Sequence, residues 1–99
     1  MTRDDVLAWL DTRRPAPPAA LRAHIERALP TVTDTKLPLP AHLADVGRRL
    51  LGKVASRPAG GRELALDLLA ADAFITYAFE AQAEADVGGV AHLAEGVMP

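Results

Sequence analysis

The sequence predicts an all-α protein, folded as a small antiparallel four-helix bundle with a short C-terminal helical turn. Three observations support this prediction. Hydrophobic residues recur at helical spacing in four segments. No segment outside a proline-rich stretch alternates with the period of two that is typical of a strand. Finally, Leu and Ala, which favour helices, supply most of the hydrophobic residues, whereas aromatic residues make up only 4% of the chain.

The length of 99 residues indicates one domain, so we expect a single helical domain over residues 1–99. It divides into a helical hairpin (1–30), a proline-rich linker (31–39) and a second hairpin with the C-terminal turn (40–99). The three prolines Pro30, Pro38 and Pro40 are expected to keep the linker extended.

The first two helices are predicted over residues 2–14 and 17–29. Thr2 and Asp5 have the spacing of a capping box at the start of the first helix, and Pro15 is expected to end it. Only a few residues connect the two segments, so they are expected to form an antiparallel hairpin.

The third and fourth helices are predicted over residues 40–56 and 62–86, and they are expected to form the second hairpin. Gly88 and Gly89 follow the fourth helix in the manner of a glycine C-cap. A final turn with the sequence VAHLAEG is expected to pack back on the bundle.

Equal rise per residue places residue i of the third helix level with about residue 118 − i of the fourth helix. Asp72 is then within a turn of Arg49, so one ion pair between the two helices is expected. Glu80 and Glu84 extend beyond the start of the third helix. Their expected partners are arginines of the first hairpin such as Arg13, the linker, solvent or another chain.

The fourth helix is hydrophobic on more sides than a surface helix needs. At about 100° per residue, Glu63 and Asp67 lie on one side, and Asp72, Thr76 and Glu80 lie on roughly the opposite side. We expect Asp67 to be solvated and Asp72 to be the carboxylate with a specific partner. Because each helix of a small bundle contacts only two or three others, the surplus apolar surface predicts self-association, with a two-fold dimer as the expected form.

Two hypotheses assign residues of this helix to a site. In the first hypothesis, the self-association surface consists of Leu68, Ala71, Phe74, Ile75 and Phe79. In the second, the chain is a bundle that binds a small molecule or a metal, with a polar site at Asp72, Thr76, Tyr77 and Glu80. A buried carboxylate beside His24 or His42 without an arginine partner would favour the second hypothesis. An ion pair between Asp72 and an arginine of the third helix would count against it.

The sequence contains no recognisable pattern of catalytic residues. There is no cysteine, Ser56 is the one serine, and no glycine-rich phosphate loop is present. His24, His42 and His92 fall on different predicted elements, and no His-x-x-x-His pair exists. We therefore expect no enzyme activity, no metal and no cofactor, and we expect exposed or helix-capping histidines.

Charge argues against nucleic-acid and membrane partners. The formal net charge is −2, and the basic row Arg49, Lys53 and Arg57 on the third helix faces acidic residues elsewhere in the chain. A DNA-binding helix-turn-helix is therefore the least favoured hypothesis. Asp67 and Asp72 interrupt the most hydrophobic segment, which argues against a membrane-spanning helix.

The N-terminal segment has acidic residues where a signal peptide has basic ones, so we expect a cytoplasmic protein. The leading hypothesis for function is a non-catalytic protein–protein interaction module that forms a homodimer. Such a module could regulate or scaffold another protein.

Overall fold

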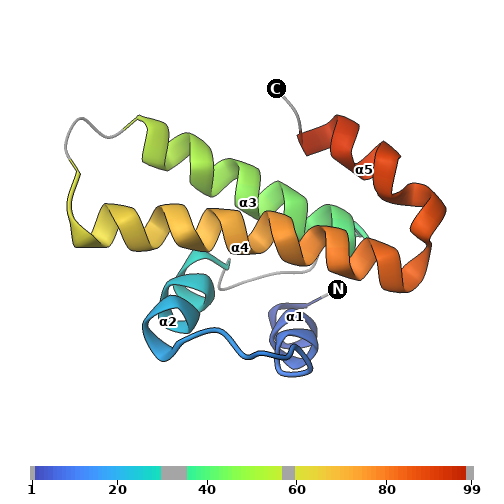
Figure 1. Ribbon diagram of the computed structural model, residues 1–99, viewed down its shortest axis with the longest axis horizontal. Coiled ribbons are helices and arrows are strands. Elements are labelled where there is room, and N and C mark those ends of the chain that lie inside the picture. The colour runs from blue at the N-terminus through green and yellow to red at the C-terminus, as the bar shows by residue number, and fades with distance from the viewer. Residues whose placement is uncertain (1, 30–35, 57–59, 98–99) are drawn as a thin grey trace.

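A computed structural model describes residues 2–29, 36–56 and 60–97 of the chain. This part of the chain is helical and contains no strand, which confirms the all-α prediction. Two long helices run along the longest axis of the molecule as an antiparallel hairpin. Two shorter helices lie on one side of this hairpin, and the last helix lies on the other side (Figure 1). In chain order the helices are α1 (Arg3–Leu10), α2 (Ala19–Ala28), α3 (Leu39–Ala55), α4 (Arg62–Ala85) and α5 (Val90–Val97).

The first helix begins as predicted but ends four residues early. Thr2 and Asp5 form the expected capping box, in which each side chain binds the backbone N–H of the other residue. The bond from the Thr2 backbone lowers the pKa of Asp5 below its usual value. The range 2–14 was too long because α1 ends at Leu10, where the chain turns and the Thr12 hydroxyl donates to the Trp9 carbonyl.

Two polar contacts join α1 to α2, and their positions along the helices indicate that the two helices run in opposite directions. Near the start of α1, the Arg3 guanidinium donates to the backbone carbonyl of Glu26, 3.0 Å away and close to the end of α2. Beyond the end of α1, Asp11 pairs with Arg22 of α2 at 2.9 Å. With 8 and 10 residues, these helices are much shorter than the 24 residues of α4, so they cover only part of the α3–α4 hairpin.

The second hairpin matches the predicted boundaries closely, since α3 and α4 each end one residue earlier than expected. After α4, a short 3₁₀ segment (Val87–Gly89) leads directly into α5. The expected C-terminal turn is therefore a complete helix of 8 residues, and it packs back on α3 and α4 as predicted. Most of the predicted linker (31–39) lies outside the described residues.

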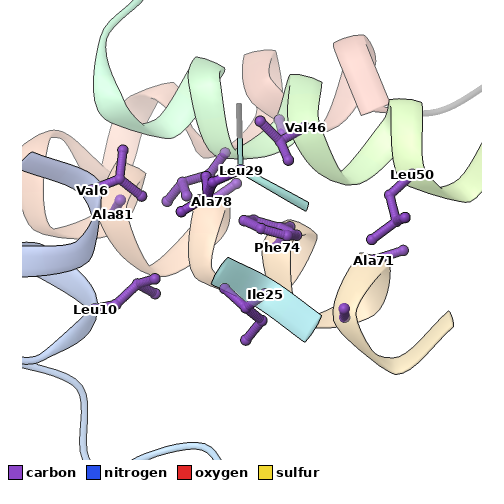
Figure 2. Packing of buried hydrophobic residues seen from close by; sticks show 13 residues of the cluster. Val6, Leu10, Ile25, Leu29, Val46, Leu50, Ala71, Phe74, Ala78 and Ala81 are labelled. Atoms are coloured by element: carbon purple, nitrogen blue, oxygen red, sulfur yellow. The ribbon is translucent and has the colours of Figure 1, made fainter. Parts of the chain in front are cut away.

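The hydrophobic core forms where α1 and α2 meet the α3–α4 hairpin. Phe74 of α4 is fully buried, and it lies among side chains from several helices (Figure 2). Of the surrounding residues, small alanines come from α4, whereas larger aliphatic side chains come from the other helices. The buried residues that Figure 2 labels around Phe74 are Val6, Leu10, Ile25, Leu29, Val46, Leu50, Ala71, Ala78 and Ala81.

Gly47 allows α3 and α4 to approach closely at this core. A Cβ atom at this position would lie 2.9 Å from Cβ of Phe74, 3.0 Å from Cγ1 of Ile75 and 3.2 Å from the Ala71 carbonyl oxygen. The contact also fixes the register of the hairpin, because it places Gly47 level with residues 71–75. The predicted relation, with residue 47 level with about residue 71, therefore agrees with the structure to within a turn.

We expect the substitution Gly47→Ala to lower the free energy of unfolding by about 1–3 kcal/mol, because the added methyl group would overlap backbone and side-chain atoms of α4. Gly52→Ala is the matched control in the same helix. Apart from its chain neighbours and the backbone of its own helix, no atom of the described chain lies within 4 Å of a Cβ at Gly52, so alanine there should stabilise the protein by about 0.5–1 kcal/mol. Urea denaturation measures both values. Equal effects of the two substitutions would contradict the close approach.

Candidate interaction surface

A buried histidine joins α2 to the first half of α4. His24 is only 5% exposed, and its Nδ1 lies 2.9 Å from Oδ1 of Asp67. Its Nε2 lies 3.3 Å from the Glu63 carboxylate, which also approaches Arg27 of α2 at 3.8 Å. A protonated imidazole can donate from both nitrogens, whereas a neutral one donates from only one. The cluster is thus a polar link between two helices in which each group meets an oppositely charged or hydrogen-bonding neighbour.

This arrangement reverses the roles expected for the two aspartates of α4. Asp67 is not solvated, because its side chain is 19% exposed and binds His24. Asp72 is exposed and does not pair with Arg49, since Asp45 of the same helix α3 holds Arg48 and Arg49 at 3.1 Å each. The register was right, but a nearer carboxylate within α3 takes both arginines.

A second polar cluster joins the end of α1 to the second half of α4. Arg13 lies 3.0 Å from Glu84 and 3.6 Å from Glu80, so these glutamates do find an arginine of the first hairpin. The hydrogen bond to Glu84 raises the pKa of Arg13 above its usual value. The guanidinium also stacks over Trp9, 4.0 Å from the ring centroid, and Trp9 meets Tyr77 edge-on at 5.9 Å. This cluster fixes α1 on α4.

The polar site of the second hypothesis is not assembled in the structure. Asp72 and Thr76 are exposed on the outside of α4, whereas Tyr77 and Glu80 belong to the contact with α1. Burial, together with Glu80, raises the pKa of the Tyr77 hydroxyl. Among the described residues, no three His, Asp or Glu side chains are grouped so that they could hold a metal ion. His24 does lie beside a carboxylate, but the group also includes Arg27.

His42 is the second buried histidine, and like His24 it was wrongly expected to be exposed or helix-capping. It is 5% exposed, and its buried Nε2 has no hydrogen-bond partner among the described residues. Burial lowers the pKa of His42 below its usual 6.5. The physical cause is that a charged imidazole loses more hydration than a neutral one. His92, by contrast, is 92% exposed and lies 3.8 Å from Glu95.

Two shallow hollows lie beside the N-terminal end of α3. One, of about 360 Å³, lies between α3 and α5 and is mostly apolar, with Asp45 and Arg48 in its wall. The other, of about 430 Å³, lies between α1, the start of α3 and the end of α4, and is lined by Trp9, Leu39 and Glu84 among others. Both are wide open to solvent, and their charged residues are already paired. Neither has the converging polar groups of an enclosed ligand site.

Large apolar side chains are exposed at the end of the α3–α4 hairpin that α5 does not cover. Leu68 and Leu69 of α4 are 48% and 53% exposed, and Leu51 of α3 is 42% exposed. Leu51 is one turn beyond Gly47, so it lies about level with the two α4 leucines. We call these three residues the leucine patch. It is a candidate interaction surface because apolar side chains exposed together on a protein often mark a contact with a partner.

The sequence located this surface only in part. Leu68 is exposed as expected, and Ile75 and Phe79 are half-buried. Ala71 and Phe74 cannot belong to an outer surface in this fold, because both are buried in the chain's own core. Leu51 and Leu69 were missed. Helical periodicity shows which residues of α4 share a face, but it does not show which face packs against the core. It therefore could not separate the inner apolar residues from the outer ones.

Comparison with protein-family models, with curated proteins and with solved structures finds no match to this chain. Within the described residues, no helix combines the length and the hydrophobicity needed to cross a lipid bilayer. Function must therefore be argued from the surface itself.

We expect Asp67→Ala to lower the free energy of unfolding by about 1–3 kcal/mol, because buried His24 would lose its closest hydrogen-bond partner. Asp72→Ala is the matched control in the same helix, and we expect a change within about 0.5 kcal/mol because Asp72 is exposed. Urea denaturation of dilute protein measures both. If Asp72→Ala is the more damaging substitution, the roles assigned to the two aspartates are wrong.

Stability is expected to fall as the pH drops below about 6.5, the pKa of histidine in the unfolded chain. The folded-state pKa of His42 is lowered, so in this range the unfolded chain binds a proton that folded His42 does not, and acid favours unfolding. The variant His42→Leu removes this contribution, so its stability should decrease less between about pH 7.5 and about pH 5.5, an interval of roughly one unit either side of the unfolded value. Thermal denaturation of both proteins across the pH series tests this. Parallel curves would show that His42 does not contribute.

Proposed function

We propose that the chain is a non-catalytic interaction module that acts as a homodimer through the leucine patch. The observation that supports this proposal is the exposure of Leu68 and Leu69, which are adjacent in α4, the longest helix of the described chain. Fully burying a leucine contributes about 1.5–3 kcal/mol, so a surface that keeps two of them half-exposed has an appreciable gain available from association.

The polar groups of the molecule favour this proposal over a ligand-binding or catalytic one. The carboxylates Asp67, Glu80 and Glu84 and the buried histidine His24 are occupied in contacts between helices. They stabilise the fold and are not directed at a common point where a substrate could bind. A paired module of this kind is suited to a regulatory or scaffolding role, because dimerisation presents two copies of every other surface to a further partner.

The wild-type chain should shift from monomer to dimer as its concentration rises in size-exclusion chromatography with multi-angle light scattering. Leu68→Lys and Leu69→Lys should each weaken the dimer about tenfold or more, because a charge would replace an apolar contact. Leu37→Lys is the matched control: Leu37 is 43% exposed but is not part of the leucine patch.

Circular dichroism establishes that each variant remains helical. A wild-type chain that stays monomeric over the whole concentration series would refute the proposal. An equal effect of Leu37→Lys would show that the leucine patch is not the surface involved.

A further inference from the structure

The exposed side of α4 carries two charges that have no partner in the described part of the chain. Arg62 opens the helix and Asp72 lies ten residues later, and both side chains are exposed. Neither makes a hydrogen bond or ion pair with any described residue. Arg62 is also poorly placed for its own helix, since the N-terminal end of a helix dipole is positive and disfavours a cation.

These two charges share one face of α4 with apolar residues. Arg62, Ala65, Leu69 and Asp72 are spaced i, i+3, i+7 and i+10, and at about 100° per residue they fall within a single stripe. All four are exposed, and Leu68 borders them on the side of α3. We call Arg62, Ala65, Leu69 and Asp72 the outer stripe. It runs from a positive end, over a small and a large apolar residue, to a negative end.

The order of residues in the outer stripe is self-complementary when two copies lie antiparallel. Arg62 and Asp72 are symmetric about position 67, and Ala65 and Leu69 are symmetric about the same position. A two-fold axis at the level of residue 67 therefore brings Arg62 of one copy opposite Asp72 of the other. The same axis places each Leu69 opposite the small Ala65 of the other copy, which leaves room for the leucine side chain. Asp67 itself points away from this face, because it binds His24 of α2.

A parallel arrangement would not have this complementarity. Identical residues would then lie level with one another, so Arg62 would face Arg62 and Asp72 would face Asp72 of the two copies. Like charges placed opposite each other oppose association, whereas opposite charges favour it and fix the register. The charges of the outer stripe thus select one orientation.

We infer that a second copy of this chain binds along the outer stripe, with the two α4 helices antiparallel and Arg62 of each copy paired with Asp72 of the other. This inference rests on the proposed function, since it names the partner and the geometry of the dimer formed through the leucine patch. The two symmetric Arg62–Asp72 pairs set the antiparallel orientation of the two copies, and the leucines of α4 supply most of the apolar contact area.

Charge reversal tests the pairing. Arg62→Asp and Asp72→Arg each convert both symmetric pairs into like-charge contacts, so each variant should dimerise about tenfold more weakly than the wild type. The double variant Arg62→Asp/Asp72→Arg restores opposite charges at both pairs, and its dissociation constant should return close to the wild-type value. An equimolar mixture of the two single variants should form a heterodimer, because each then supplies the charge that the other lacks.

Light scattering and analytical ultracentrifugation over a concentration series measure these dissociation constants. Single variants that dimerise as well as the wild type would overturn the antiparallel pairing, as would a double variant no stronger than the single ones. In either case the sensitivity of the dimer to Leu69→Lys would still uphold the proposed function. A wild-type chain that is monomeric at every concentration would overturn both.

Discussion

The close approach of α3 and α4 at Gly47 sets the register on which the rest of the structure depends. With no side chain at this position, the two helix backbones pack against each other around Phe74, and the small residues of α4 fit the same contact. The register then decides which side chains of α4 face α2, which face α1 and which remain outside. The contacts of His24 and Arg13 with carboxylates of α4, which attach the shorter helices to the hairpin, are made on the surface that this pairing presents.

Polar clusters hold the two short helices at opposite halves of α4. His24 fixes α2 near the start of α4 through Asp67, and Arg13 fixes the end of α1 near the other end through Glu84. Helices of 8 and 10 residues are too short to be stable on their own, so these contacts and the shared core must hold them in place. Because the short helices cover only one side of α4, its outer stripe is left in solvent.

The exposed outer stripe follows from the size of the protein. A chain of 99 residues buries a smaller share of its surface than a larger domain does, and here the long helix α4 keeps Leu68 and Leu69 about half exposed. In the dimer that we propose, a second copy of the chain is the additional neighbour. The charges at the two ends of the outer stripe, which have no partner among the residues that the structure describes, would give the proposed association a direction.

Local signals in the sequence determined the all-α class, the capping box of α1, and the boundaries of α3 and α4 to within a residue. Equal helical rise also predicted the register between α3 and α4, because rise depends only on backbone geometry. Periodicity on α4 identified its surplus of apolar faces. Tertiary packing alone decided which of these faces is buried, because a helical pattern does not show on which side of the helix the other helices lie. For the same reason Asp67 and Asp72 exchanged their expected roles: only the position of α2 placed buried His24 beside Asp67 and left Asp72 in solvent.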